Sequence, residues 1–489
     1  MRGKHEINMT EGPLWGKIAA FTVPLMITGF LQLLYNAADN VVVGRYAVDK
    51  EASLAAVGST GALINLIVNL FIGLSVGTSV VVAQYKGAQK DREVHETVHT
   101  SVTISVIFGF ILMIIGLTLA KPLLQLMDSP DDVIDLAALY MRIYFVGMPV
   151  NMLYNFGSAV MRAVGDTKRP MFILIVSGLI NVVLNLLFVI VFHMDVAGVA
   201  LATIISQAVS AVAVVICLMH NDDCTRLELK KLGVNMKRVK ELAESGMPAG
   251  LQGMLFSISN VLIQSSVNSF KSTFMAGNAA AGNLEGFVYT MMNTLYQASL
   301  TFCGQNVGAK KYRRVGKITM ICAVYVTVLG LVMGVGVYKN GHALISIYNE
   351  NEDVIKAGLI RLRYVCQPYF FCGLMDMLVG SLRGMGKSVM PMIVSLLGAC
   401  VLRVVWIYTI FRLDHRPEVL YISYPISWIV TAAVHFVCFL VVYKKLLAKG
   451  MAEGARRIMK SDLALSVTGL AGPDGDDRGN PVGTVYIGL

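Results

Sequence analysis

The amino-acid sequence predicts an all-α membrane protein with about twelve transmembrane helices in two six-helix parallel repeats. The first observation is composition: 55% of the 489 residues are hydrophobic and 15% are charged, whereas about 25% of the residues of a soluble domain are charged. The second is a series of apolar segments long enough to cross a bilayer. The third is a group of motifs that recurs at one fixed spacing.

The apolar segments define the predicted spans. A helix needs about 20 mostly apolar residues to cross the hydrocarbon core of a bilayer. Several segments exceed this length, which allows tilt or interfacial extension. The predicted spans lie at about residues 15–40, 54–83, 98–120, 136–160, 170–192, 196–219, 243–268, 278–304, 318–338, 357–382, 389–411 and 420–443.

The distribution of Lys and Arg predicts the orientation. Loops rich in basic residues, such as residues 310–317, alternate with loops that contain few. Cytoplasmic loops are enriched in Lys and Arg, so we expect both termini in the cytoplasm and a multi-pass protein of the inner (cytoplasmic) membrane. These loops also explain the formal net charge of +10, so we expect a lipid bilayer as the partner surface and no nucleic acid.

The eight cysteines form no CxxC pair, and most of them lie within apolar segments. We interpret them as small buried hydrophobic side chains, without a disulfide framework or a structural metal site. The sequence also contains no GxxxxGK[ST] motif for binding nucleotide phosphates, so we expect no ATP-driven process.

The two halves of the chain resemble each other. Each half contains about six predicted spans, an even number, so both enter the membrane in the same direction. Such repeats suit a transporter whose two lobes rock around a midplane site. We therefore assign one lobe to residues 1–222 and the other to residues 223–450. Three matches share an offset of 221: residues 84–94 with 305–315, Arg162-x-x-Gly165 with Arg383-x-x-Gly386, and Pro170-Met171 with Pro391-Met392.

An acidic residue within the first span is the first candidate for a site. Asp39 lies three residues after Asn36, so both side chains share one helical face. Charges within spans are costly and usually face a cavity. A carboxylate beside an amide could bind sodium or cycle a proton. The alternative is an interfacial aspartate near the helix end, since Gly44 and Arg45 follow closely.

Other polar groups fall within later spans. Asn155 and Asp376 occupy equivalent positions at the offset of 221. Asp376 is a candidate for a functional carboxylate or for a structural pair with a buried cation, for which Arg403 is the obvious partner. A second set leaves a binding and a structural interpretation equally open: Asn181 and Asn185, four apart on one helical face, and Glu285, nearer a membrane face.

These motifs resemble the multidrug and toxic compound extrusion (MATE) family. Pro24-Leu-Met followed by residues 33–45, LLYNAADNVVVGR, is similar to the family's first helix, and residues 162–170 and 198–203 fit the same pattern. The resemblance covers about residues 8–447. It implies two six-helix lobes, a central cavity, and antiport of cationic or amphipathic compounds against sodium or protons.

The family's acidic residues match this sequence only in part. The first-helix aspartate of the family corresponds to Asp39. The fifth-helix acid of the proton-coupled branch falls at Asn185, and the seventh-helix glutamate of the NorM branch has no counterpart after Pro248. Asp376 resembles a tenth-helix acid of that branch. The coupling ion therefore stays open between sodium and proton, and we expect no cofactor and no metal site beyond a sodium site at Asp39.

Residues 451–489 differ from the rest of the chain and resemble part of the CinA-type nicotinamide-mononucleotide amidase domain. Their sequence predicts a strand, a Gly-rich loop and a second strand. Two strands cannot bury a core, and the upstream part that would supply the family's nucleophile is absent. We therefore expect a truncated fragment without amidase activity. It is either a gene fusion or an artefact that joins two reading frames.

Together these observations predict a monomeric, cation-coupled antiporter, not an enzyme, that exports organic cations, drugs or other amphipathic compounds by alternating access. One alternative is a flippase for lipid-linked saccharides of the same superfamily. Such proteins carry a basic central cavity, whereas the spans here contain few cations beyond Arg403, Arg361 and Arg363. A second alternative, from a different class, is an enzyme that acts through its amidase-like tail.

Overall fold

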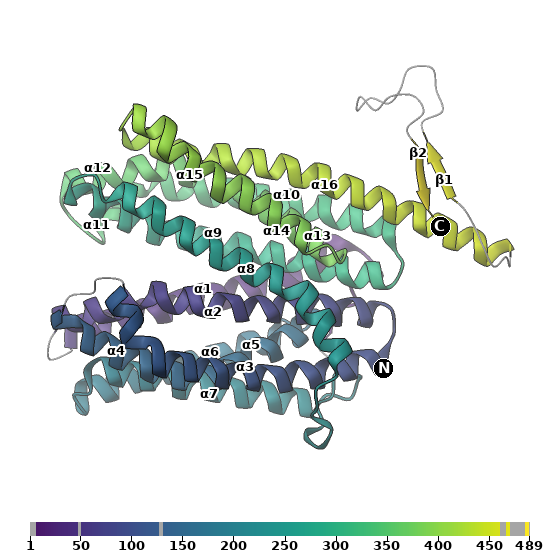
Figure 1. Ribbon diagram of the computed structural model, residues 1–489, viewed down its shortest axis with the longest axis horizontal. Coiled ribbons are helices and arrows are strands. Elements are labelled where there is room, and N and C mark those ends of the chain that lie inside the picture. Colours follow the sequence, from purple (N-terminus) through teal and green to yellow (C-terminus); the bar gives the residue numbers. More distant parts are fainter. Residues whose placement is uncertain (1–5, 47–49, 127–130, 460–465, 470–484, 489) are drawn as a thin grey trace.

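The computed structural model describes residues 6–46, 50–126, 131–459, 466–469 and 485–488. These residues form an elongated bundle whose long helices run roughly along one axis (Figure 1). The α-helices are α1 Leu14–Tyr46, α2 Lys50–Gly87, α3 Asp91–Leu126, α4 Asp131–Val146, α5 Met148–Ala163, α6 Lys168–Leu186, α7 Asp195–Met219, α8 Met236–Val267, α9 Ser272–Gly308, α10 Tyr312–Lys339, α11 Gly341–Ser346, α12 Glu352–Arg361, α13 Phe370–Gly384, α14 Val389–Ser395, α15 Leu402–Trp406 and α16 Pro417–Met459.

Short π-helical or 3-10 segments continue several of these helices. They lie at Leu187–Val191 after α6, at Leu362–Cys366 and Gln367–Tyr369 between α12 and α13, and at Leu396–Val401 and Ile407–Phe411 on either side of α15; a separate 3-10 turn covers Leu229–Lys231.

The prediction of an all-α membrane protein is confirmed. Among the described helices, ten are long and apolar enough to cross a membrane, or eleven if α4 and α5, bent by 49°, count as one span. The remaining predicted span, 278–304, corresponds to α9, which runs along the bundle, contains Asn278, Glu285 and Asn293, and is not among these ten. Composition therefore supports ten to eleven spans instead of about twelve.

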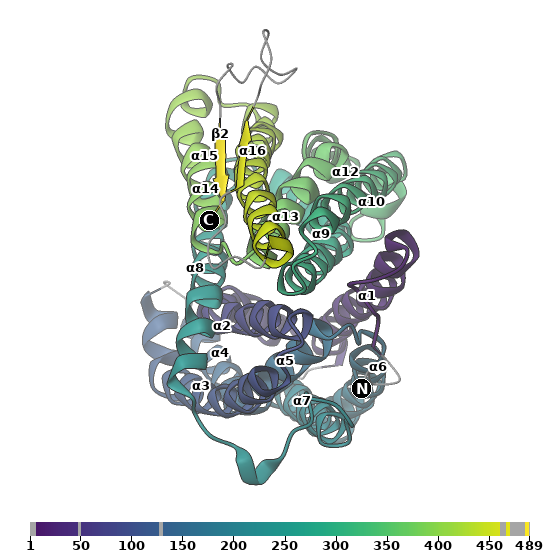
Figure 2. The ribbon, with the colours of Figure 1, turned by 90° about the vertical axis from the view of Figure 1, so that its right-hand side faces the viewer.

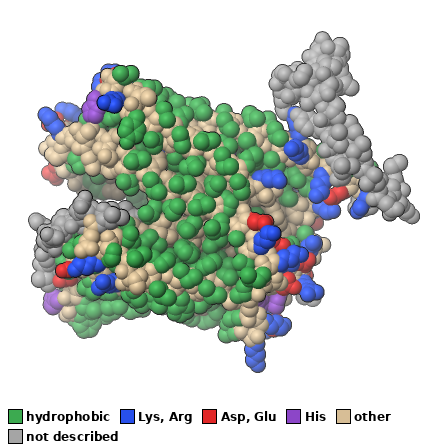
Figure 3. Space-filling view, viewed as in Figure 1, with side chains coloured by type: hydrophobic (Ala, Val, Ile, Leu, Met, Phe, Trp, Pro, Cys, Tyr) green, Lys and Arg blue, Asp and Glu red, His purple; other side chains and the backbone are tan. Residues whose placement is uncertain are grey.

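The outer surface is apolar across the middle of the bundle, and charged side chains gather at its two ends (Figure 3). On α6, the side chains of Phe172, Leu179 and Val183 are each at least 60% exposed. They are seven and four residues apart, so they share one helical face. Large apolar side chains exposed in this way are expected where a helix faces lipid.

The helices gather into two lobes, with α2–α7 in the N-terminal lobe and α9–α16 in the C-terminal lobe (Figures 1 and 2). Two helices lean across the boundary. The first half of α1 packs into the C-terminal core, where Phe21 meets Phe302 edge to face. Its counterpart α8 packs against α2, where a Cβ on Gly73 would lie 2.1 Å from the backbone nitrogen of Gly250.

The lobes meet at the end of the bundle where residues 6–12 and the last turns of α16 lie, which we call the termini end. Gln84 Nε2 donates to the carbonyl of Gly384 at 2.9 Å, and Gln305 Nε2 donates to the carbonyl of Ala163 at 2.7 Å. Gln84 and Gln305 are 221 positions apart, as are Ala163 and Gly384. Residues that are equivalent in the sequence repeat therefore form two equivalent hydrogen bonds between the lobes.

The N-terminal segment, residues 6–12, reinforces this closure. Within the N-terminal lobe, Lys86 Nζ lies 3.1 Å from Glu6 and 2.7 Å from Asp223. Across the boundary, Asn306 Nδ2 donates to the carbonyl of Met9 at 3.1 Å. At the opposite end, Figure 3 shows the surface hollowed between the lobes.

The chain beyond the C-terminal lobe begins within a helix. α16 continues through residue 450 without a break, and Glu453 forms a 2.8 Å ion pair with Lys310. Further on, β1 Ser466–Gly469 and β2 Val485–Gly488 pair antiparallel. The predicted strands are thus present, and the predicted loop between them lies outside the described residues.

Candidate functional site

A small polar pocket lies within the N-terminal lobe. We call it the amide pocket; it has a volume of about 120 Å³. Asp39 is the one charged side chain among the described residues that line it. Its polar lining is Gln32, Tyr35, Asn36, Asp39, Asn151, Tyr154, Asn155, Ser177, Asn181, Thr203, Ser206, Gln207 and Ser210.

The structure brings Asp39 on α1 into contact with the asparagines of α6. Asn185 Nδ2 donates to Asp39 Oδ1 and, at 3.2 Å, to Asn181 Oδ1. Asn181 Nδ2 in turn lies 3.5 Å from Thr203 Oγ1 on α7. The two helical faces that the sequence identified separately therefore form one chain of hydrogen bonds.

One acceptor in this chain is left over. Asn185 is fully buried, and its Oδ1 atom accepts no hydrogen bond from the described residues. A buried acceptor without a donor is costly, and a cation beside the Asp39 carboxylate would use it. Carboxylate, amide and hydroxyl oxygens are the ligands that hard cations prefer. The arrangement therefore fits a small cation, and a proton on Asp39 would satisfy the same carboxylate.

Two of the predicted residues occupy the edge of this pocket. Asn36 lines it and is exposed. Asn155 donates to the backbone and side-chain oxygens of Asn151, both at 2.9 Å. Thr203 and Gln207 were missed by sequence reasoning, because a threonine and a glutamine within an apolar span carry no signal of their own.

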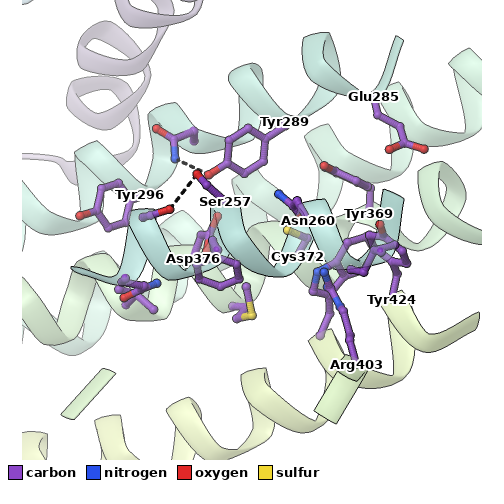
Figure 4. A pocket seen from close by; sticks show the side chains of 18 of the residues that line it. Ser257, Asn260, Glu285, Tyr289, Tyr296, Tyr369, Cys372, Asp376, Arg403 and Tyr424 are labelled. Carbon is purple, nitrogen blue, oxygen red and sulfur yellow. Dashed lines mark hydrogen bonds between the residues drawn. The ribbon is translucent and has the colours of Figure 1, made fainter. Parts of the chain in front are cut away.

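A larger cavity lies in the C-terminal lobe, bordered by Asn69 of α2. We call it the arginine cavity; its volume is about 680 Å³ (Figure 4). Its charged lining consists of Glu285, Arg361, Asp376, Arg383 and Arg403. Tyrosines and Trp428 supply most of its aromatic surface: Tyr289, Tyr296, Tyr369, Tyr424 and Trp428.

Glu285 is part of a buried ion pair. Both of its oxygens accept hydrogen bonds at 2.8 Å from Arg361, through Nε and Nη2. Arg361 Nη1 also donates to Asn278 Oδ1 at 2.6 Å, which accepts from Tyr421 at 2.7 Å. This geometry favours the structural interpretation of Glu285, because its carboxylate is already matched by a bidentate partner.

Asp376 lies deep in the arginine cavity, where it faces Tyr289 and Arg383. The expectation that Arg403 pairs with it is wrong. Among the described residues Arg403 takes part in no ion pair within 4.0 Å. Its guanidinium lies instead over the rings of Tyr424 and Trp428, at 4.2 and 5.4 Å from the ring centroids.

The two lobes have therefore diverged around equivalent positions. Asn155 lines the amide pocket, and Asp376, 221 positions later, lines the arginine cavity. On the last helix of each lobe, Thr203 and Gln207 of the amide pocket correspond at the same offset to Tyr424 and Trp428. One lobe is thus lined by amides around a single acid, and the other by arginines and aromatic rings.

Comparison with known proteins agrees with this architecture. The chain is 27% identical over 402 residues to the "Probable multidrug resistance protein YpnP" of Bacillus subtilis (strain 168), a match that covers 81% of this chain and 88% of that protein. A MOP superfamily transporter from Pyrococcus furiosus aligns with a TM-score of 0.85 at 21% identity, over 91% of this chain and 100% of that chain. For the Vibrio cholerae MATE transporter VcmN the TM-score is 0.81 at 19% identity, over 88% and 98%.

Two families match the sequence itself. Residues 441–489 match the CinA C-terminal domain, which agrees with the resemblance of the tail. MatE matches residues 24–187 and 248–409, one segment in each repeat. The first segment contains Asp39 and the asparagines of the amide pocket, and the second contains the five charged residues of the arginine cavity. Because the two segments cover more than half of the chain, we conclude that the chain belongs to the MatE family.

Proposed function

We propose that this chain is a cation-coupled antiporter that exports organic cations and other amphipathic compounds across the cytoplasmic membrane by alternating access. It acts as a monomer with both termini in the cytoplasm. Its lobes comprise residues 1–222 and 223–450, and its tail carries no amidase activity. Relatives named as multidrug resistance or multidrug export proteins in Bacillus subtilis and Staphylococcus aureus support the export of small organic molecules.

The observation that carries this proposal is the placement of Asp39. It is a carboxylate on a membrane helix that faces a polar pocket, next to an amide oxygen that accepts no hydrogen bond from the described part of the chain. The pocket, at about 120 Å³, is much smaller than the roughly 300–1,000 Å³ typical of sites for drug-sized ligands. The arginine cavity, at about 680 Å³, falls within that range. The cation and the organic compound therefore bind in different lobes.

Coupling between these sites runs through α1. Its second half carries Asp39 into the amide pocket, while its first half packs with the C-terminal core through Ile18 and Phe21. A ligand shifts a conformational equilibrium only by its difference in affinity between the two states. Binding a cation at Asp39 favours the arrangement in which α1 completes the amide pocket, and the organic compound favours the other.

The closed termini end supports an outward-facing direction for this arrangement. With both termini in the cytoplasm, the contacts of Gln84 and Gln305 close the cytoplasmic side, and the hollow between the lobes opens outward. This state releases the organic compound and takes up the cation.

Ethidium efflux from pump-deficient bacteria tests the proposal. Cells expressing the full chain are compared with cells expressing Asp39→Asn, in sodium-containing and sodium-free buffer at equal membrane expression. We expect efflux from the first and at most about a tenth of it from the second. Dependence on sodium would assign sodium as the coupling ion, and sodium-independent efflux abolished by a protonophore would assign the proton. Full efflux by Asp39→Asn would remove Asp39 from the mechanism.

The arginine cavity also supports the alternative function, a flippase for lipid-linked saccharides. Arg361, Arg383 and Arg403 line one space, so the cavity is more basic than the sequence alone indicated. Proteoliposomes that contain a fluorescent undecaprenyl-diphosphate saccharide in one leaflet would test it. Under the antiporter proposal the lipid does not cross faster than in protein-free liposomes, and rapid crossing would replace the antiporter by the flippase.

A further inference from the structure

Arg403 is a buried cation that forms no ion pair with the described residues. It is 4% exposed, and its Nε atom donates to Ser427 Oγ at 2.8 Å. Its Nη2 atom is buried and donates to none of the described residues. An arginine cannot shed its charge in a protein, so the uncompensated guanidinium is costly unless a ligand supplies the missing acceptor.

The surroundings of Arg403 hold its guanidinium in one orientation. The Tyr424 ring lies beneath it at 4.2 Å and the Trp428 ring at 5.4 Å. Trp428 is itself held edge to face by Tyr369, with ring centroids 5.0 Å apart. Figure 4 shows Arg403 beside Tyr424, at the side of the cavity away from Asp376 and Tyr296. A fork fixed in this way is suited to a planar, two-oxygen anion.

Of the other two arginines of the cavity, Arg361 has an anionic partner, whereas Arg383 has neutral partners and a buried Nε atom that donates to none of the described residues. Arg361 forms the bidentate pair with Glu285. Arg383 donates to Tyr296 at 2.6 Å and to Gln252 at 2.8 Å, and it is the cation that faces Asp376. Three arginines thus stand against two carboxylates, so positive charge exceeds negative charge by at least one in either protonation state of Asp376.

We infer that the arginine cavity binds aromatic carboxylates, with the ligand's carboxylate on Arg403 and its ring among Tyr369, Tyr424 and Trp428. The inference rests on the proposed export function and adds to its substrates compounds that carry one negative group, including zwitterions whose amine would face Asp376. With Asp376 ionised the excess is one positive charge, which favours a monoanion over a diphosphate. The amide pocket, which has no arginine in its described lining, is left to the cation.

Calorimetric titration of the full chain in phosphatidylcholine nanodiscs tests this assignment, with empty nanodiscs subtracted. The probes are 2-naphthoate and its neutral isostere 2-naphthamide. A charge-assisted bidentate contact predicts a Kd at least about tenfold lower for the carboxylate. An amide that binds as tightly as the carboxylate would overturn the assignment, and this comparison needs no variant.

Variants then place the site. Arg403→Gln should weaken 2-naphthoate at least about tenfold and leave 2-naphthamide within about twofold, which also reports that the variant is folded. Arg403→Lys keeps the charge but not the planar guanidinium, so its Kd for 2-naphthoate should lie between those of the wild type and Arg403→Gln. The matched control is Arg363→Gln, because Arg363 is exposed and does not line the cavity. Unchanged 2-naphthoate binding by folded Arg403→Gln, or by Arg403→Lys if Arg403→Gln does not fold, would refute the site.

Failure of the export proposal gives a different pattern. Asp39→Asn should still bind 2-naphthoate at least about tenfold more tightly than 2-naphthamide, because the contact that distinguishes the two probes lies at Arg403 and Asp39 lies in the other lobe. If Asp39→Asn loses ethidium efflux but keeps this binding, the defect lies in the coupling at Asp39 and the anion site is unaffected. Absent ethidium efflux in the wild type together with selective 2-naphthoate binding would overturn the antiporter and retain the anion site.

Discussion

At the scale of single residues, the two lobes differ in how they stabilise a carboxylate within the membrane. Asp39 has one amide donor and a spare amide oxygen beside it, and no described cation shares its pocket. Glu285 has a guanidinium that covers both of its oxygens. Under the proposed function the first carboxylate exchanges a cation, whereas the second is fixed by its partner. Their responses to substitution should differ accordingly.

Asn185→Ala should impair transport without unfolding the protein. It removes the donor to Asp39 and the spare oxygen beside it, so the cation loses a ligand and the carboxylate its orientation. We expect ethidium efflux to fall roughly tenfold at limiting coupling ion. Asn340→Ala is the control, since Asn340 is exposed at a helix end and donates only to the carbonyl of Gly336. Wild-type efflux by Asn185→Ala would show that Asp39 acts without this amide.

Glu285→Gln should instead destabilise the protein. It leaves the buried Arg361 charge unpaired, which lowers the free energy of unfolding by about 3–5 kcal/mol. The double variant Glu285→Gln with Arg361→Met should regain much of this stability. Thermal unfolding in detergent measures both. The exposed pair of Lys121 and Asp135 provides the control, because Asp135→Asn should leave the melting temperature unchanged. A Glu285→Gln variant as stable as wild type would mean that the pair is not structural.

Sequence reasoning found the candidate residues but not their partners. The spacing of Asn36 and Asp39, and that of Asn181 and Asn185, identifies a helical face from local geometry alone. It cannot show that α1 and α6, 146 residues apart at the contact, turn these faces toward each other. For Arg403 the same limitation produced an error, because the neighbouring span presents Tyr424 and Trp428 to it and not Asp376.

At the scale of helices, the closed termini end depends on two glycines. A Cβ on Gly308 of α9 would lie 1.9 Å from the Gln84 carbonyl, and one on Gly87 of α2 would lie 1.9 Å from the Gln305 carbonyl. The helices touch backbone to backbone here, so no side-chain rotation relieves the clash. By contrast, a Cβ on Gly286 of the same α9 meets nothing within 4 Å.

Gly308→Ala should therefore open the termini end. The added methyl forces α2 and α9 apart, at a cost of about 1–3 kcal/mol in this conformation. With a single cysteine introduced near residue 84 in a cysteine-free background, we expect faster labelling by a maleimide than in the parent protein. Gly286→Ala should label like the parent. Equal labelling of Gly308→Ala and Gly286→Ala would mean that the backbone contact does not hold the lobes closed.

The N-terminal segment adds a pH dependence at the same end. Burial raises the pKa of Glu6 to about 7, and its hydrogen bond to Asp223 adds to the rise. Although burial opposes it, hydrogen bonds from Glu6, Lys86 and Thr225 hold the pKa of Asp223 well below its usual range. The docked segment thus binds a proton on Glu6 that the undocked segment releases near pH 4.5.

Docking of residues 6–12 should weaken as pH rises. A raised pKa in the docked state gives stabilisation that is complete below about pH 4.5 and is lost through about pH 7. Hydrogen exchange, corrected for intrinsic rates, should show more protection of residues 6–12 at pH 5.5 than at pH 8. Glu6→Gln should remove the difference, whereas Glu350→Gln, on an exposed loop, should keep it. Protection that does not change with pH in the wild type would contradict this.

At the scale of the whole molecule, transport and tail are separable. Residues up to Met459 continue α16, whose last turns contact the C-terminal lobe where Gly450 lies against the Tyr312 ring and Glu453 pairs with Lys310. The hairpin of β1 and β2 follows this helix outside the bundle (Figure 1). Each strand has four residues, and a two-stranded hairpin is marginal on its own.

Deleting residues 460–489 should leave function intact. We expect ethidium efflux within about twofold of the full chain, because the deletion starts after the last helical contact with the lobe. The purified full chain should release no nicotinic acid mononucleotide from nicotinamide mononucleotide. Efflux abolished by the deletion at normal expression would give the tail a part in transport. Deamidation by the full chain, lost on deletion, would make the tail an enzyme.

The overall fold was more accessible from sequence than the site. Span length, basic loops and the offset of 221 predicted the all-α bundle of two repeats, including the span that corresponds to α9. The lobes also share helices more than a division at residue 222 suggests, since α1 begins in the C-terminal core. Packing of this kind depends on side chains far apart in the chain, which no local pattern contains.

The reciprocal bonds of Gln84 and Gln305 make the boundary between the lobes equivalent to the interface of a twofold dimer. Each half contributes a glutamine donor, a closely packed glycine and a carbonyl at a helix end. Each of these groups contacts an equivalent group of the other half. We therefore expect the halves to find their register without a covalent link. Two fragments produced from separate genes, divided in the segment between α7 and α8, should assemble with each other in the membrane.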